Sequence, residues 1–145
     1  TTIAWLWALG VIAEIAVFFF MASLFRRHSV RFLILLSIVL TLVRWLMNGY
    51  LAEFFVWMLL AQLLHAASFG LFHAAGIYLI DQYFQGRHHG KGQAVFAASS
   101  HGLGGALGML MAGYAWSFGH AELAYGMSAL MVLIAFVFAW RGVRN

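Results

Sequence analysis

Long apolar stretches alternate with short polar turns along the chain, and this pattern predicts five membrane-spanning helices. The stretches cover residues 3–25, 32–50, 54–80, 93–116 and 121–140. Each is long enough to cross a hydrocarbon core about 30 Å thick at a rise of about 1.5 Å per residue. A β-barrel is excluded, because its strands are only about ten residues long and alternate in polarity. We therefore predict an all-α integral membrane protein.

The composition supports this prediction and limits the kinds of partner that the protein is expected to have. Hydrophobic residues make up 65% of the 145 residues and charged residues 8%, a balance foreign to soluble domains. The net charge of +4 does not indicate nucleic-acid binding, because the basic residues lie in short turns rather than along one face. The lipid bilayer is the expected surroundings.

The turns also predict how the helices are oriented. Lys and Arg occur in three of the polar segments, as Arg26, Arg27, Arg31, Arg87, Lys91, Arg141 and Arg144, and are absent from the turns at 51–53 and 117–120. Because Lys and Arg favour the cytoplasmic side, the first helix should begin outside and the last should end in the cytoplasm, in a cell (inner) membrane. An odd number of helices that starts outside predicts a fragment whose preceding spans are missing.

Three ionisable residues lie near the middle of the first three apolar stretches: Glu14, Arg44 and His65. A charge in hydrocarbon costs several kcal/mol unless it faces a cavity or a partner, which makes such residues functional candidates. Glu14 shares a helix face with Trp7 and Gly10. It could bind a substrate or a proton, or it could be hydrogen-bonded to a neighbouring helix for packing.

The second helix carries a polar stripe formed by Ser37, Thr41, Arg44 and Asn48, which predicts a wet cavity. Arg44 stays protonated and needs an anionic partner, either Glu14 or an anionic substrate. The alternative is that its side chain extends to the outer surface.

The third helix has the most polar face, where Gln62, His65, Phe69, His73 and Gly76 lie together. Histidine gains or loses a proton near neutral pH, which suits a coupling step, although both histidines could also be packing residues. No other helix repeats the spacing of His65 and His73, so we expect no haem, no metal and no other cofactor. On the fourth helix, Gly104, Gly105 and Gly108 predict close helix packing.

Several motifs together resemble one family of carriers. They are Gly10 and Glu14 ahead of Phe18-Phe19-Phe20, then Arg26-Arg27, Arg44-Trp45, Gln62-Leu63-Leu64-His65 and the glycine-rich run 102–108. They resemble the C-terminal half of a major facilitator superfamily transporter, of the phenylpropionate permease-like branch related to lactose permease-type proton symporters. The resemblance covers nearly the whole chain, as helices eight to twelve of twelve, and implies a partial C-terminal six-helix half whose partner is the missing N-terminal half.

The resemblance implies roles for individual residues. Arg44 and His65 correspond to an arginine and a histidine of the proton-coupling network of such carriers. Where the lactose permease type has a carboxylate one turn after the histidine, this chain has Ser68, which leaves Glu14 as the candidate proton carrier. The expected substrate- and proton-binding residues are Glu14, Arg44, His65, Gln62, His73, Trp7 and Phe69.

The expected function is proton-coupled secondary active transport of a small organic solute by alternating access. An aromatic acid such as phenylpropionate fits Arg44 and the aromatic side chains, and a sugar or nucleoside-like substrate is the other option. Two alternatives stay open: efflux of drugs or metabolites by proton antiport, and a helical membrane subunit that does not transport. We expect no enzyme and no catalytic residue, since no serine and histidine or paired carboxylates have catalytic spacing.

Overall fold

The structure is a bundle of helices long and apolar enough to cross a membrane. The computed structural model describes residues 2–143, of which 2, 3 and 119 are described in backbone only. Its candidate spans are Ala4–Arg27, Val30–Tyr50, Phe55–Tyr83, Gly86–Phe118 and His120–Gly142. The predicted fold class, an all-α membrane protein with five spans, is thereby confirmed.

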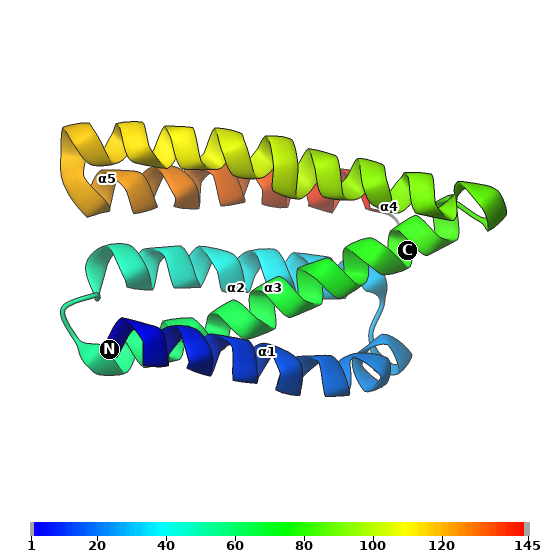
Figure 1. The fold of residues 1–145 in the computed structure, drawn as a ribbon, viewed down its shortest axis with the longest axis horizontal. Helices are drawn as coiled ribbons and strands as arrows, with labels where there is room; N and C mark the ends of the chain where they lie inside the picture. Colours follow the sequence, from blue (N-terminus) through cyan, green and yellow to red (C-terminus); the bar gives the residue numbers. More distant parts are fainter. Residues whose placement is uncertain (1, 144–145) are drawn as a thin grey trace.

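The helices follow one another with short connections (Figure 1). They are α1 (Thr2–Arg27), α2 (Val30–Tyr50), α3 (Phe55–Tyr83), the 3₁₀ helix η1 (Gly86–His88), α4 (His89–Ala97), the π-helix η2 (Ala98–Gly104) and α5 (Gly105–Gly142). The fourth span is made of η1, α4, η2 and the beginning of α5. At His120, where φ is 57°, α5 reverses its direction, and the rest of α5 forms the fifth span.

The π-helix η2 interrupts a span for which the sequence analysis expected an ordinary helix. Just before and within it, the hydroxyl of Ser99 donates to Val95 O at 2.7 Å and the hydroxyl of Ser100 donates to Phe96 O at 2.5 Å. These side chains compete with backbone N–H groups for the same carbonyls, which favours a widened turn.

The middle of the bundle is formed by α2 and α3, and α3 runs obliquely across it (Figure 1). Buried Met21, Leu33 and Leu71 join α1, α2 and α3. A second cluster of buried residues on α2 and α3, Ile34, Ile38 and Ala75, is covered by the last part of α5. The fourth span lies at the periphery, and its most apolar window contains no buried residue.

Close helix contacts occur at glycines, but not at those predicted. A Cβ on Gly49 would lie 2.8 Å from Tyr125 Cβ, and one on Gly76 would lie 2.6 Å from Phe96 Cζ, so α2 meets α5 and α3 meets α4 at these points. Within the described residues, nothing lies within 4 Å of a Cβ built on Gly105 or Gly108, and the contact at Gly104 is its own helix's Ser99 O at 3.2 Å. Packing of these three glycines against another part of the protein stays a prediction.

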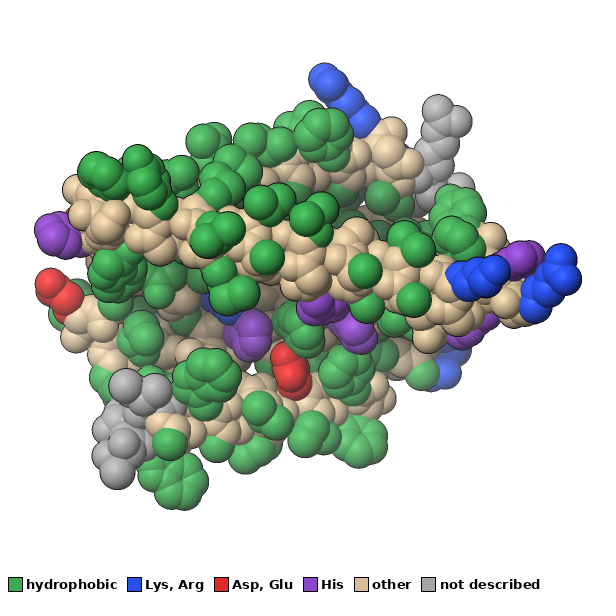
Figure 2. All heavy atoms as spheres, turned by 45° about the horizontal axis from the view of Figure 1, so that its top comes forward, with side chains coloured by type: hydrophobic (Ala, Val, Ile, Leu, Met, Phe, Trp, Pro, Cys, Tyr) green, Lys and Arg blue, Asp and Glu red, His purple; other side chains and the backbone are tan. Residues whose placement is uncertain are grey.

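The surface is apolar along the helices and basic at one end. Large hydrophobic side chains such as Phe19 (81% exposed) and Phe138 (73%) face outward, as lipid contact requires. In Figure 2, green side chains cover most of the face shown, and blue side chains gather in the right half of the view. We call this region the basic end; its residues are Arg26, Arg27, Arg31, Arg87, Lys91 and Arg141.

Candidate functional site

A polar pocket opens between α1, α2 and α3, with a volume of about 420 Å³. Its lining residues are Trp7, Gly10, Val11, Glu14, Arg44, Gln62, His65 and Phe69. Six of the seven side chains predicted to bind substrate or protons therefore line one cavity, and His73 does not. One side of the pocket is open, since Trp7 on its rim is 73% exposed. In Figure 2, a red acidic side chain and purple histidine side chains lie in the hollow between rows of green hydrophobic side chains.

The three ionisable residues form a chain of contacts in the pocket. Arg44 Nη1 donates to His65 Nδ1 at 2.5 Å, and His65 Nε2 lies 3.7 Å from Glu14 Oε1. Because a guanidinium has donors and no acceptor, Nδ1 of His65 must be the acceptor. The neutral ring then carries its proton on Nε2, on the side that faces Glu14.

The Arg44 guanidinium has hydrogen-bonding capacity to spare. Its Cζ lies 4.4 Å above the centre of the Trp45 ring, and its buried Nε has no hydrogen-bond partner among the described residues. In that part of the chain, no carboxylate oxygen lies within 4.0 Å of an Arg44 nitrogen. From the sequence, either Glu14 or an anionic substrate was predicted as the partner of Arg44. In the structure His65 lies between Arg44 and Glu14, so Arg44 can still bind an anion.

The close approach of α1 and α3 places Gln62 in the pocket. A Cβ on Gly10 would lie 3.2 Å from Gln62 Oε1, so the glycine leaves room for the amide beside Glu14 and His65. The amide offers donors and an acceptor. Together with Trp7 and Phe69, it gives the pocket both polar and aromatic walls.

The predicted polar stripe on α2 does not line this cavity, apart from Arg44. Ser37 is buried, and its hydroxyl donates to Ile34 O at 2.7 Å, while the Thr41 hydroxyl donates to Ser37 O at 2.8 Å. Hydroxyls that bond to the preceding turn of their own helix need no water. For Ser37 and Thr41, the expectation that the side chain faces a wet cavity was therefore wrong.

His73 lies outside the pocket, on the part of α3 that is nearer the basic end. Its ring stacks on Phe69, with 5.8 Å between ring centroids, and its other neighbours are Phe96 and His101. His101 was not predicted as a site residue from the sequence. The signal that could have found it is an imidazole inside an apolar span at the depth of His73.

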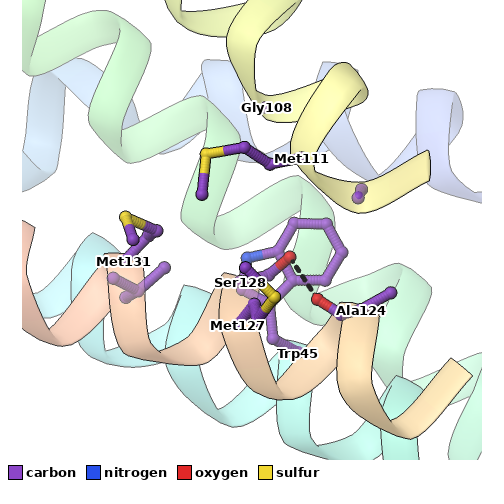
Figure 3. Close-up of a pocket in the computed structure, with 9 residues that line it drawn as sticks. Trp45, Gly108, Met111, Ala124, Met127, Ser128 and Met131 are labelled. Atoms are coloured by element: carbon purple, nitrogen blue, oxygen red, sulfur yellow. Dashed lines mark hydrogen bonds between the residues drawn. The ribbon is translucent and has the colours of Figure 1, made fainter. Parts of the chain in front are cut away.

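A second, apolar pocket of about 200 Å³ lies between α2 and the two arms of α5 (Figure 3). Its walls are Trp45, Gly108, Met111, Ala112, Ala124, Met127, Ser128, Met131 and Val132. The Ser128 hydroxyl donates to Ala124 O at 2.9 Å, so it has no free proton to offer. Without an ionisable side chain, this pocket cannot supply the charge chemistry of the first one.

A pocket with ionisable residues inside a bundle of apolar helices is the arrangement of a membrane transporter. The model of the MFS_1 like family matches residues 1–127. The chain therefore belongs to this family, whose members are transporters of the major facilitator type and not enzymes.

A curated relative agrees with this assignment. The chain is 32% identical over 135 residues to a protein of Escherichia coli (strain K12) named as a probable 3-phenylpropionic acid transporter. The match covers 93% of the chain and 34% of the relative, so the chain spans about a third of that protein's length. No solved structure matches the chain.

Proposed function

We propose that the chain is the C-terminal part of a proton-coupled carrier for a small aromatic carboxylic acid. The observation that carries the proposal is the Arg44 guanidinium, which lines the pocket beside the aromatic walls of Trp7 and Phe69 and has no carboxylate partner among the described residues. A guanidinium binds a carboxylate through two parallel hydrogen bonds, and an aromatic ring fits against the indole and phenyl groups. The name of the relative supports an aromatic acid as the substrate.

The contacts of Arg44 suggest how substrate and proton are coupled. A bound carboxylate competes with His65 for the guanidinium, and when Arg44 turns to the substrate, His65 Nδ1 loses its donor. The freed nitrogen can then take a proton, and the imidazolium is stabilised by the Glu14 carboxylate on its other side. Binding of the anion thereby favours binding of the proton, and both would cross the membrane in one alternating-access cycle.

The proposal includes an orientation and a partner. With the basic end in the cytoplasm, α1 begins outside and α5 ends inside, as the distribution of Lys and Arg favours for an inner membrane. The open side of the pocket would be closed by an N-terminal segment that corresponds to the rest of the relative. We call the chain joined to such a segment the complete carrier.

Uptake into proteoliposomes tests the proposal. We expect the complete carrier to accumulate labelled 3-phenylpropionate when the outside is acidic, and to lose this accumulation when a protonophore dissipates the gradient. Proton antiport would reverse the response, so that an acidic outside empties the vesicles of substrate. Equal distribution of the label with and without the gradient would contradict proton coupling, and failure to move the label at all would contradict the substrate class.

A further inference from the structure

Two histidines form a second titratable group outside the substrate pocket. His73 of α3 and His101 of η2 lie with their ring centroids 5.9 Å apart, edge to face. Phe96 of α4 packs against both rings, at 6.4 Å from His73 and 6.3 Å from His101. The pair thus joins the third and fourth spans, between the pocket and the basic end.

One nitrogen of the pair has no hydrogen-bond partner among the described residues. Nδ1 of His73 is buried and has no hydrogen-bond partner in that part of the chain. Nδ1 of His101 lies 3.2 Å from the Ser100 hydroxyl. No hydrogen bond joins the two rings among the described residues, and histidine is the side chain best suited to exchange a proton with water near neutral pH.

The charged groups on the neighbouring helices lie away from this pair. Glu14 of α1, Arg44 of α2 and His65 of α3 lie at the pocket, on the other side of Phe69. Nearer the basic end, Asp81 of α3 is paired with His89 of α4 at 2.5 Å. Among the described residues, no carboxylate lies within 4.0 Å of a nitrogen of His73 or His101.

Phe69 separates the pair from the ionisable residues of the pocket. Its ring stacks on His65 at 5.6 Å between centroids and on His73 at 5.8 Å, and its edge meets His101 at 6.3 Å. A phenyl ring carries no proton donor or acceptor, so a proton can pass from one side to the other only when the ring moves and water enters. Phe69 also lines the pocket, so a substrate bound there would contact the ring and could displace it.

The π-helix gives the pair a means of moving. His101 lies within η2, where the backbone is already widened between Ala98 and Gly104. π-helical segments inside α-helices often occur at functional sites. A shift of η2 would carry His101 toward or away from His73.

We propose that His73 and His101 form a proton-transfer station between the pocket and the basic end, gated by Phe69. In the step that unloads the carrier, the N–H bond of protonated His65 breaks, water in the opened gap carries the proton, and an N–H bond forms at His73 or His101. The pair then releases the proton to water at the basic end. This inference rests on the proposed proton coupling.

The test compares two activities of the complete carrier in proteoliposomes. The variant carries His73→Gln and His101→Gln. The control carries His120→Gln, which replaces an exposed histidine at the reversal of α5, away from the basic end. We expect uptake driven by a pH gradient to fall by about tenfold or more in the double variant, because a positioned acid–base group contributes at least that much. Counterflow at equal pH should fall much less, since neither ring lines the pocket.

Three outcomes would overturn the inference, and they differ from one another. Gradient-driven uptake and counterflow that fall in parallel would assign the pair a packing role. A double variant that remains as coupled as the control would show that protons take another path. A wild-type carrier that exchanges substrate without any response to the gradient would overturn the proposed proton coupling, and the station with it.

Discussion

Replacement of Arg44 by glutamine should lower the initial rate of 3-phenylpropionate uptake by the complete carrier by about a hundredfold. Loss of one partner of a buried, hydrogen-bonded charge pair costs about 2–5 kcal/mol, and about 2.7 kcal/mol corresponds to that factor. Glutamine also leaves Nδ1 of His65 without its charged donor. Arg44→Lys should retain part of the activity, because an ammonium keeps the charge but not the two-pronged geometry.

The matched control for this substitution is Arg26→Gln. Arg26 lies in the last turn of α1 at the basic end, away from the pocket lining, so its replacement should leave the uptake rate within a factor of about two, as is usual for exposed charges. Normal uptake by Arg44→Gln would mean that the guanidinium does not bind the substrate.

Replacement of Glu14 by glutamine should uncouple the carrier. Glutamine keeps the size of the side chain and a hydrogen-bonding oxygen, but it cannot become an anion that stabilises protonated His65. Accumulation driven by a pH gradient should fall toward equal distribution of the label, because a carrier without proton coupling only equilibrates its substrate across the membrane. The measurement is the final ratio of label inside to label outside.

Glu122→Gln is the control for Glu14. Glu122 lies just after the reversal of α5 and does not line the substrate pocket. If Glu14→Gln still concentrates the label as the control does, the carboxylate has only a packing role. That result would favour the alternative left open by the sequence, in which Glu14 is hydrogen-bonded to a neighbouring helix for packing.

The sequence predicted the helices and most of the pocket for a simple physical reason. The length of an apolar run reports a membrane span, and helical phasing reports which side chains share a face. Glu14, Arg44 and His65 were found in this way, because an ionisable residue has few stable positions in hydrocarbon. Whether they bind substrate and proton stays a prediction that the experiments above address.

What the sequence did not predict depends on how the helices are rotated and how polar groups are satisfied locally. Ser37 and Thr41 share a stripe with Arg44, yet their hydroxyls bond to their own helix. The π-helix η2 arises from serine contacts that a hydropathy pattern does not register, and it determines where His101 lies.

Ser68 shows how the structure changes the interpretation of a departure from the family pattern. It stands one turn after His65, where lactose permease-type carriers have a carboxylate. Here it is only 2% exposed, and its hydroxyl donates to His65 O at 3.2 Å. Ser68 does not line the pocket, whereas Glu14 approaches His65 from α1. We infer that a carboxylate from a different helix takes the place beside the histidine.

The central claim is that an anion bound to Arg44 drives protonation of the pair formed by His65 and Glu14. The most direct measurement is the proton uptake when saturating 3-phenylpropionate is added to the purified complete carrier in weakly buffered solution near neutral pH. We expect an uptake of about one proton per substrate bound, because an anion that favours the protonated pair is accompanied by its proton, and little uptake by the variant with Glu14→Gln and His65→Gln. Substrate binding by the wild-type carrier without proton uptake would contradict it.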